Sequence, residues 1–426
     1  HSNSKLLIIT ADRPEILRKT GANQTTDQVG IYKLIKTHDL VSEIELKPLF
    51  NGKPIHLNIQ FSEPLISEEK NDWLVDLKNE PINYKNNING KLETSTGVLI
   101  IGHDNAGYTV DEINSFISKL KWPVIAENPI SFPQALPHAV LYLSDPKIRQ
   151  VLAPENIIVI GRTTLSRSTN EFIKLAKNLT VIDPRIADVD NNRQADLLVK
   201  SLPIDVVSES TSIDIWQKSS DLAAIEIKKL VWSEQAAIKC ICESLTSMSA
   251  LFVGSSRPVR DIEAFTKFQT GVFVFANRGL AGIDGNISTV FGIAKKYQVT
   301  NAIMGDLTFL HDISALTNSS KENLRIFVID NNGGGIFSTL PQAGSTGFEQ
   351  VFGTPHNLDL VKVISGFGVS VSRVSELAGL ELITKKPIKG FEVVVVQVPS
   401  REVNAQMLKE ITQRVSSAVR IGINLA

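Results

Sequence analysis

The sequence predicts an α/β protein built from several mostly parallel sheets flanked by helices. Short, continuously apolar runs alternate with helical segments through most of the 426 residues, a pattern typical of parallel sheets buried on both faces. Polar and glycine-rich segments follow several of these runs, at the edge where open α/β sheets bind ligands. At roughly 100 to 200 residues per domain, a chain of this length accommodates two or three domains.

Residues 1–66 contain two apolar strands, Leu6–Ile9 and Pro54–Asn58, separated by a polar loop. So short a region cannot bury a full core, and its first strand needs earlier neighbours to form a sheet. We therefore expect the C-terminal part of a domain whose N-terminal part is missing. Residues 67–96 are rich in Glu, Asn and Lys and are interpreted as a linker with room for one helical piece.

A second α/β unit is expected over residues 97–207, because strand-like and helical runs alternate there. No Gly-x-Gly-x-x-Gly motif follows its first strand, which argues against a dinucleotide site. The strands are predicted at Gly97–His103, Val124–Ala126, Ile157–Gly161 and Leu179–Ile182, and helices at Val110–Leu120 and Thr169–Ala176.

Residues 208–231 are interpreted as a linker and the start of a long helix, Leu222–Leu245, that leads into a last domain at 232–426. Five or six strands in about 195 residues can close a core of their own. These strands are predicted at Ala250–Val253, Val272–Phe275, Ala302–Met304, Leu324–Ile329 and Val393–Val398.

The composition narrows the class of protein. Hydrophobic residues make up 42% and charged residues 21%, and the formal net charge is −1, whereas a nucleic-acid-binding domain is normally strongly basic. The sequence shows neither an apolar run of about 18 residues, as a membrane helix requires, nor a secretory signal. The two cysteines, Cys240 and Cys242, cannot supply a disulfide framework or a metal site. We read them as helix residues of a cytoplasmic protein.

Two segments at strand ends carry the clearest site signal. Gly305–Thr308 follows one apolar run, and Asn331–Gly335 follows the next, with Asn331 placed 25 positions after Asp306. A carboxylate and an amide oxygen suit Mg²⁺, and glycines permit close backbone approach to phosphates. Ordinary turns use the same residue types, but the pairing across one strand-helix-strand unit favours a metal-diphosphate site. Asp306, Asn331 and the carbonyl of Gly333 would hold the metal.

This Gly-Asp and Asn-Asn spacing resembles the cofactor motif of thiamine-diphosphate enzymes. Further segments resemble the branch that joins 2-oxoglutarate to isochorismate in menaquinone or phylloquinone synthesis. The resemblance implies a three-domain fold with a truncated pyrimidine-binding domain, a central domain and a diphosphate-binding domain, and thiamine diphosphate with Mg²⁺ or Mn²⁺ as cofactors. The segments that carry it are Thr10–Pro14, Gly21–Gln24, Asn277–Gly285 and Phe352–Pro355.

The resemblance also implies the reaction and the assembly. 2-Oxoglutarate would lose CO₂, and the resulting succinic-semialdehyde carbanion would add to isochorismate. A glutamate activates the cofactor in this family, and we expect it upstream of residue 1, so no catalytic residue is assigned within this chain. Because the family places its cofactor between two subunits, a homodimer or homotetramer is expected.

Several arginines lie just past the ends of predicted strands. Arginine suits bidentate carboxylate recognition, so the set indicates anionic substrates, although any one of them alone could be a solvated surface group. The family has a lysine and an arginine at the position of Arg167 and Ser168, so one positive charge is lost there. The set is Arg13, Arg167, Arg257, Arg260 and Arg278.

By resemblance, Arg13 and Gln24 face isochorismate, and Arg167 retains one of the family's charges. Ser256, Arg260 and Arg278 match positions that bind substrate carboxylates near the cofactor.

Apolar residues near the glycine loop complete the predicted site. Ile283 matches a position that supports the bent cofactor, and Ile336, Phe337 and Leu340 match its apolar wall, although plain core packing is an equally open reading. We assign Phe337 and Leu340 to the substrates. The cofactor contacts are assigned to Gly305, Asp306, Leu307, Thr308, Ile283, Asn331, Gly333, Gly334 and Ile336.

The sequence predicts no histidine relay and leaves two other functions open. His56 and His311 have no obvious acidic partner in the sequence, so no histidine relay is predicted. Another thiamine-diphosphate 2-keto acid decarboxylase or carboligase remains open, although small keto acids make less use of Arg13, Arg167, Arg260 and Arg278 together. An inactive, cofactor-binding regulatory subunit also remains open, because the activating glutamate lies outside the sequence.

Overall fold

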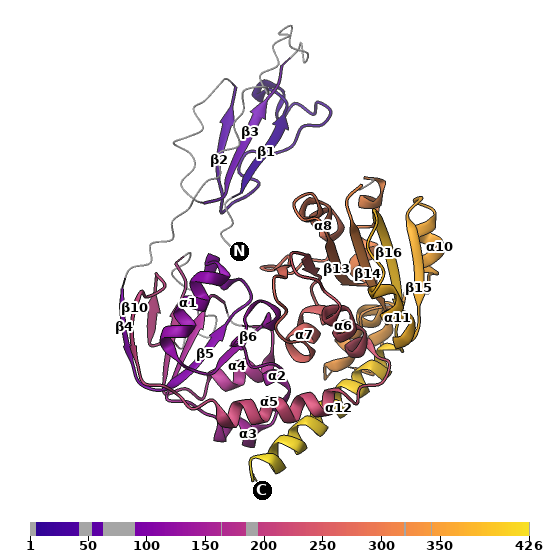
Figure 1. The fold of residues 1–426 in the computed structure, drawn as a ribbon. Coiled ribbons are helices and arrows are strands. Elements are labelled where there is room, and N and C mark those ends of the chain that lie inside the picture. The colour runs from indigo at the N-terminus through magenta and orange to yellow at the C-terminus, as the bar shows by residue number, and fades with distance from the viewer. Residues whose placement is uncertain are drawn as a thin grey trace. The chain divides into compact units, whose positions relative to one another are not determined.

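The computed structural model describes residues 6–41, 53–62, 90–162, 164–184, 195–318, 321–341 and 343–425. The chain divides into two compact units, residues 1–85 and 86–426 (Figure 1), and each is described by itself. Among the described helices, none combines the length and the apolar character that a membrane crossing demands.

The first unit is a parallel three-stranded sheet. Its order is β1 (Leu7–Asp12), β3 (Ile55–Gln60) and β2 (Lys36–Leu40). The two predicted strands are confirmed as β1 and β3, whereas β2 was not predicted. The residues of β2 are mostly polar, so only their pairing with β3 identifies the strand.

The end of the predicted linker is a strand. β4 (Lys91–Thr94) pairs in parallel with β10 (Asp205–Ser208), and Leu92 on β4 is buried. The linker prediction is therefore wrong at residues 91–94, a mostly polar strand of which Leu92 alone is buried. The predicted stretch at 67–89 lies outside the described residues.

The central sheet is parallel throughout, and its core strands are buried on both faces. The four predicted strands are confirmed, and a fifth, β9, was not predicted. The predicted helix at 110–120 matches its bounds, and Thr109 and Glu112 form a capping box at its start. The order is β6 (Val124–Ala126), β5 (Gly97–Ile101), β7 (Asn156–Ile160), β8 (Asn178–Ile182) and β9 (Leu197–Val199), with helices α1 (Val110–Leu120), α2 (Ala139–Tyr142), α3 (Pro146–Val151) and α4 (Arg167–Ile173).

The last sheet has six parallel strands, in the order β12 (Phe273–Phe275), β11 (Ala250–Val253), β13 (Thr300–Gly305), β14 (Leu324–Asp330), β16 (Phe391–Gln397) and β15 (Ser370–Val374). All five predicted strands are confirmed. The sixth, β15, is a largely exposed edge strand with polar residues and gave no apolar signal. The helices are α7 (Arg257–Phe265), α8 (Asn286–Ala294), α9 (Asp306–His311), α10 (Leu360–Ser365), α11 (Leu377–Thr384) and α12 (Arg401–Gly422).

The predicted long helix at 222–245 is two helices, α5 (Asp214–Ile227) and α6 (Glu234–Glu243). Ser233 starts α6, because its hydroxyl accepts a hydrogen bond from the amide of Ala236. Both cysteines lie on α6, as predicted, and both are free thiols.

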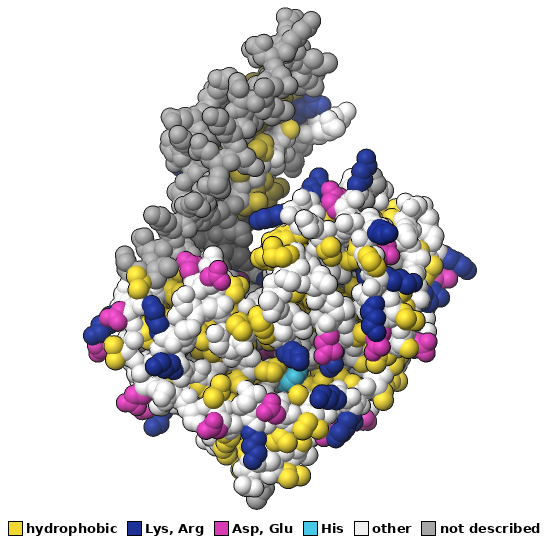
Figure 2. Space-filling view, viewed as in Figure 1, with side chains coloured by type: hydrophobic (Ala, Val, Ile, Leu, Met, Phe, Trp, Pro, Cys, Tyr) yellow, Lys and Arg dark blue, Asp and Glu magenta, His cyan; other side chains and the backbone are white. Residues whose placement is uncertain are grey.

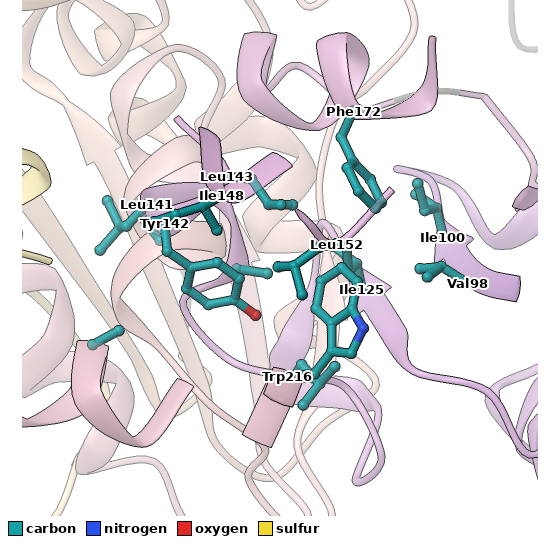
Figure 3. Packing of buried hydrophobic residues seen from close by; sticks show 14 of the residues in the cluster. Val98, Ile100, Ile125, Leu141, Tyr142, Leu143, Ile148, Leu152, Phe172 and Trp216 are labelled. Atoms are coloured by element: carbon teal, nitrogen blue, oxygen red, sulfur yellow. The ribbon is translucent and has the colours of Figure 1, made fainter. Parts of the chain in front are cut away.

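The C-terminal helix joins the two larger sheets. α12 packs beside α5 (Figure 1), and its apolar residues enter the core of the central sheet. Trp216 of α5 contacts Tyr142 and Phe172 in this core (Figure 3), with ring-centre distances of 6.3 and 5.6 Å. Edge-on aromatic contacts of this kind add to the apolar burial. The two sheets of the second unit therefore share one packed junction.

The surface agrees with the nearly neutral composition. On the face shown in Figure 2, basic and acidic side chains are interspersed over the second unit.

His138 lies buried at the junction between the central and last sheets, and its Nδ1 donates to the carbonyl of Ala264 on α7 at 2.8 Å. Burial lowers the pKa of His138 to about 4. In the unfolded chain the same imidazole takes up a proton near pH 6.5. The folded protein therefore loses stability relative to the unfolded chain as pH falls from 6.5 toward 4, and this loss is absent above pH 6.5. We expect His138→Asn to abolish this acid-dependent loss, which amounts to roughly 3 kcal/mol of unfolding free energy. Urea unfolding at several pH values measures the effect.

Asparagine suits this position, because His138 has a left-handed φ of 67°. His311→Asn is the matched control, since His311 is exposed. An unchanged slope of unfolding free energy against pH in His138→Asn would contradict the assignment.

Candidate cofactor and substrate site

The carboxyl ends of β13 and β14 bring the two predicted motifs together. These strands are hydrogen-bonded neighbours, so Asp306 after β13 and Asn331 after β14 come to the same sheet edge. The amide of Gly333 donates to Asp306 Oδ2 at 2.8 Å, and Asp306 and Asn331 are buried. The predicted metal residues therefore form one cluster.

Asn331 Oδ1 is suited to a metal ion. It is buried and has no hydrogen-bond partner among the described residues, and such an atom is costly unless a ligand satisfies it. Together with the Asp306 carboxylate and a loop carbonyl, it forms an oxygen ligand set of the kind that Mg²⁺ or Mn²⁺ accepts. These residues fit a divalent metal.

The glycine loop packs closely against its own chain. A Cβ on Gly333 would lie 2.2 Å from the carbonyl oxygen of Gly353, and one on Gly334 would lie 2.2 Å from that of Phe352. Gly333 also has a φ of 135°, which side chains rarely adopt. These glycines are thus required by the 352–353 segment, a role that the sequence did not reveal. Gly305 has open space at its Cβ position.

His356 is a site residue that the sequence analysis missed. Its Nε2 lies 3.3 Å from Asp306 Oδ2 and 3.6 Å from Asp330 Oδ1. Its Nδ1 accepts from the amide of Leu358, so Nε2 carries the proton and donates to Asp306. That hydrogen bond raises the pKa of His356. The only signal in the sequence was its position directly after the Phe352–Pro355 segment.

Buried carboxylates make this edge of the sheet favourable for a cation. Burial raises the pKa of Asp330, and the Asp306 charge raises it further. Glu234 on α6 is also buried, and burial, then Asp261 and more weakly Asp306, raise its pKa. A bound divalent cation would favour the ionised forms of these carboxyls. The ligand atoms of Asp306, Asp330 and His356 lie within 4.8 Å of one another, a grouping that could itself hold a metal ion.

Three predicted carboxylate-binding residues lie near the start of α7 or after β12. Arg260 Nη1 donates to the carbonyl of Ser256 at 2.7 Å, and Arg278 pairs with Glu127. Burial lowers the pKa of Arg260, and the nearby charges of Arg257 and Arg278 lower it further. Ser256 has a φ of 75°, unusual for serine and typical of strained functional positions.

Arg257 has a different role from the other arginines. It forms a buried ion pair with Asp261 on the same helix, four residues on. Its guanidinium is therefore already neutralised within the protein, and it is better explained as a structural residue than as an anion-binding one.

Arg13 and Gln24 meet within the first unit. Arg13 Nη2 donates to Gln24 Oε1 at 2.8 Å, next to the end of β1. In the same sheet, His56 lies between the hydroxyls of Thr10 and Thr37, at 2.7 and 3.0 Å. No acidic partner for His56 is found in the described part of this unit.

Arg167 and Leu340 line a cavity of about 1290 Å³ beside α12. Ser168 donates to the carbonyl of Val140 and so belongs to the local structure. Phe337 contacts the ring of Phe352 at a centre distance of 5.3 Å. His311 does have an acidic neighbour, Asp284 at 3.7 Å, contrary to expectation, but both side chains are exposed.

The remaining residues assigned to the cofactor or the substrates differ in burial. Thr308 is buried, and the amide of Leu307 donates to Asp306 Oδ1 at 2.7 Å. The four apolar wall residues are each half-buried and stand outside the core clusters, so plain core packing does not account for them. They are Ile283, Ile336, Phe337 and Leu340.

Comparison with known proteins points to one family. Residues 262–398 match the thiamine pyrophosphate enzyme, C-terminal TPP binding domain. The chain is 31% identical to the 2-succinyl-5-enolpyruvyl-6-hydroxy-3-cyclohexene-1-carboxylate synthase of a Nocardioides species, over 92% of this chain and 78% of that protein. The synthase of Thermobifida fusca is 29% identical, over 98% and 83%. That of Lysinibacillus sphaericus is 28% identical, over 97% and 82%.

A solved structure supports the fold. Benzoylformate decarboxylase from Polynucleobacter necessarius superposes with a TM-score of 0.61 at 15% identity, covering 94% of this chain and 83% of the other. The predicted α/β thiamine-diphosphate fold and its cofactors, thiamine diphosphate and a divalent metal, are thus confirmed. The chain belongs to the family of 2-succinyl-5-enolpyruvyl-6-hydroxy-3-cyclohexene-1-carboxylate synthases.

Proposed function

We infer that the protein decarboxylates 2-oxoglutarate and adds the resulting succinyl-semialdehyde unit to isochorismate, giving 2-succinyl-5-enolpyruvyl-6-hydroxy-3-cyclohexene-1-carboxylate. This reaction belongs to menaquinone or phylloquinone synthesis. The observation that carries the inference is the oxygen ligand cluster at Asp306 and Asn331, in the same unit as the partly buried arginines Arg260 and Arg278.

The diphosphate end of the cofactor is assigned to the edge of the last sheet. Asp306, Asn331 and the carbonyl of Gly333 would hold the metal, and the orphaned Asn331 oxygen supports this assignment. When bound, thiamine diphosphate supplies an electron sink for the carbon that loses CO₂. Further cofactor contacts are proposed at Gly305, Leu307, Thr308, Ile283, Gly334 and Ile336.

The arginines are assigned to the substrate carboxylates. Buried guanidinium groups bind carboxylates strongly, because little water competes for their donors. Ser256, Arg260 and Arg278 would orient one substrate, while Phe337 and Leu340 would exclude water from it. Arg13 and Gln24 of the first unit are proposed to face isochorismate, and Arg167 is proposed as a further substrate-binding residue.

The domain and assembly assignments are proposals of the same kind. The three-stranded sheet would be the C-terminal part of a pyrimidine-binding domain, followed by a central domain and a diphosphate-binding domain. We propose a homodimer or homotetramer, because the family places the cofactor between subunits, and a cytoplasmic location.

The reaction is tested by CO₂ release from 2-oxoglutarate with isochorismate, thiamine diphosphate and Mg²⁺, using the full-length protein. We expect Arg260→Gln to lower kcat/KM for 2-oxoglutarate roughly 10- to 100-fold, since a hydrogen bond to a charged group contributes about 1.5–3 kcal/mol. Arg373→Gln, at an exposed ion pair with Asp359, is the control. Release of CO₂ from pyruvate alone would favour another keto acid enzyme, and release from neither would favour a regulatory subunit.

Metal binding is tested separately from turnover. We expect Asp306→Asn to abolish tight Mn²⁺ binding in the presence of thiamine diphosphate, because the site loses its carboxylate ligand. Electron paramagnetic resonance of free Mn²⁺ measures this binding. Asp221→Asn, an exposed position on α5, should bind Mn²⁺ as the unmodified protein does. Equal affinity in the two variants would place the metal elsewhere.

His356→Asn should weaken Mn²⁺ binding by roughly 10-fold or more, because hydrogen bonds to metal-ligating carboxylates orient them. The same Mn²⁺ titration measures the effect, and His38→Asn on β2 serves as the control. Undiminished Mn²⁺ affinity in His356→Asn would show that the hydrogen bond to Asp306 does not support the site.

A further inference from the structure

A carboxylate from the central sheet holds one of the substrate arginines. Glu127 follows β6, whereas Arg278 follows β12 of the last sheet. Arg278 Nη2 lies 2.9 Å from Glu127 Oε1 and 3.2 Å from Oε2, and the two side chains are 8% and 4% exposed. This is a buried ion pair whose two partners come from different sheets.

Glu127 is itself fixed by the backbone. Its Oε2 accepts from the amide of Leu165 at 2.9 Å, in the segment that precedes α4. Nearby, the amide of Gln269 donates to the carbonyl of Ile130 at 3.1 Å, which ties the same two sheets together. The carboxylate is therefore held in place by more than the arginine it meets.

Arg278 keeps donors available for a second anion. A guanidinium has five N–H donors in a fixed plane, and the contacts with Glu127 use Nη2 alone. Arg278 Nε is buried and has no hydrogen-bond partner among the described residues. A planar carboxylate is the group that satisfies such donors in pairs.

A second arginine lies near this ion pair. Arg260 is close enough to Arg278 and Glu127 for both charges to act on it. Glu263 on α7 is buried near the same groups but forms no ion pair within the described residues, and burial, then the Glu127 charge, raise its pKa. Two guanidinium groups therefore lie close together at this junction, and Glu127 is the carboxylate that pairs with one of them.

We propose that Glu127 is a positioning residue, which fixes the guanidinium of Arg278 so that its remaining donors receive a carboxylate of the dicarboxylate keto acid. The inference rests on the proposed function, because Arg278 is assigned to the substrate there. Glu127 acts through Arg278 and does not need to touch the substrate. It would thereby link recognition of the acid to the junction between the central and last sheets.

Glu127→Gln tests the proposal, because it keeps the side chain's shape and removes its charge. We expect KM for 2-oxoglutarate to rise about tenfold with kcat changed less than twofold, since an interaction present in both ground and transition states is lost. The inhibition constant of glutarate should rise by the same factor. The affinity for thiamine diphosphate with Mg²⁺ should stay within twofold.

Glu263→Gln is the matched control. It alters a buried carboxyl at the same junction that forms no ion pair in the described chain, so KM should stay within twofold. Equal increases in KM for both variants would show that the junction has merely loosened and would overturn the proposal. An unchanged KM in Glu127→Gln would also overturn it.

Glu127→Asp covers the case in which Glu127→Gln does not fold. It retains the charge but shortens the reach, and we expect a smaller rise in KM with the same unchanged kcat. A fall in kcat without a rise in KM would count against positioning. If the unmodified protein released no CO₂ from 2-oxoglutarate, the proposed function would fail. Glutarate binding by calorimetry would still compare the variants and decide the role of Glu127.

Discussion

The hydrogen bond from the Gly333 amide to Asp306 Oδ2 is the contact on which the rest of the site depends. It joins the turn after β14 to the start of α9 after β13, and it exists because two parallel neighbours end at one edge. With the carboxylate fixed, Asn331 Oδ1 remains buried and unbonded within the described residues. The close contacts of Gly333 and Gly334 with the 352–353 segment then bring His356 to the same carboxylate.

Buried charge is distributed in two ways in this protein. At the sheet edge, buried carboxyls surround Asp306, where a divalent cation is proposed to bind. At the junction between the central and last sheets, Arg260 and Arg278 lie near Glu127, and an anionic substrate is proposed to bind there. Burial strengthens both arrangements, because the charges are poorly screened by water. The proposed metal site and the proposed substrate site thus both use buried charged groups, negative in the first and positive in the second.

Individual residues show what the sequence could and could not predict. Continuously apolar runs such as Leu324–Ile329 predicted buried strands correctly, because a parallel central strand needs apolar residues on both faces. The polar strands β2, β4 and β15 escaped prediction, since partial exposure removes the apolar signal. The break between α5 and α6 also escaped, because Ser233 resembles any helix residue until its capping bond is seen.

By itself the sequence determined the fold class and the family, and it predicted Asp306 and Asn331 as metal residues, since apolar runs and motif spacing can be read along the chain. Only the tertiary structure decided which charges meet. The pairs His356 with Asp306, and Glu127 with Arg278, join residues 50 and 151 positions apart. It also separated Arg257, already neutralised by Asp261, from the arginines assigned to substrates. Contacts between distant segments depend on how sheets and helices pack, and no local pattern records that packing.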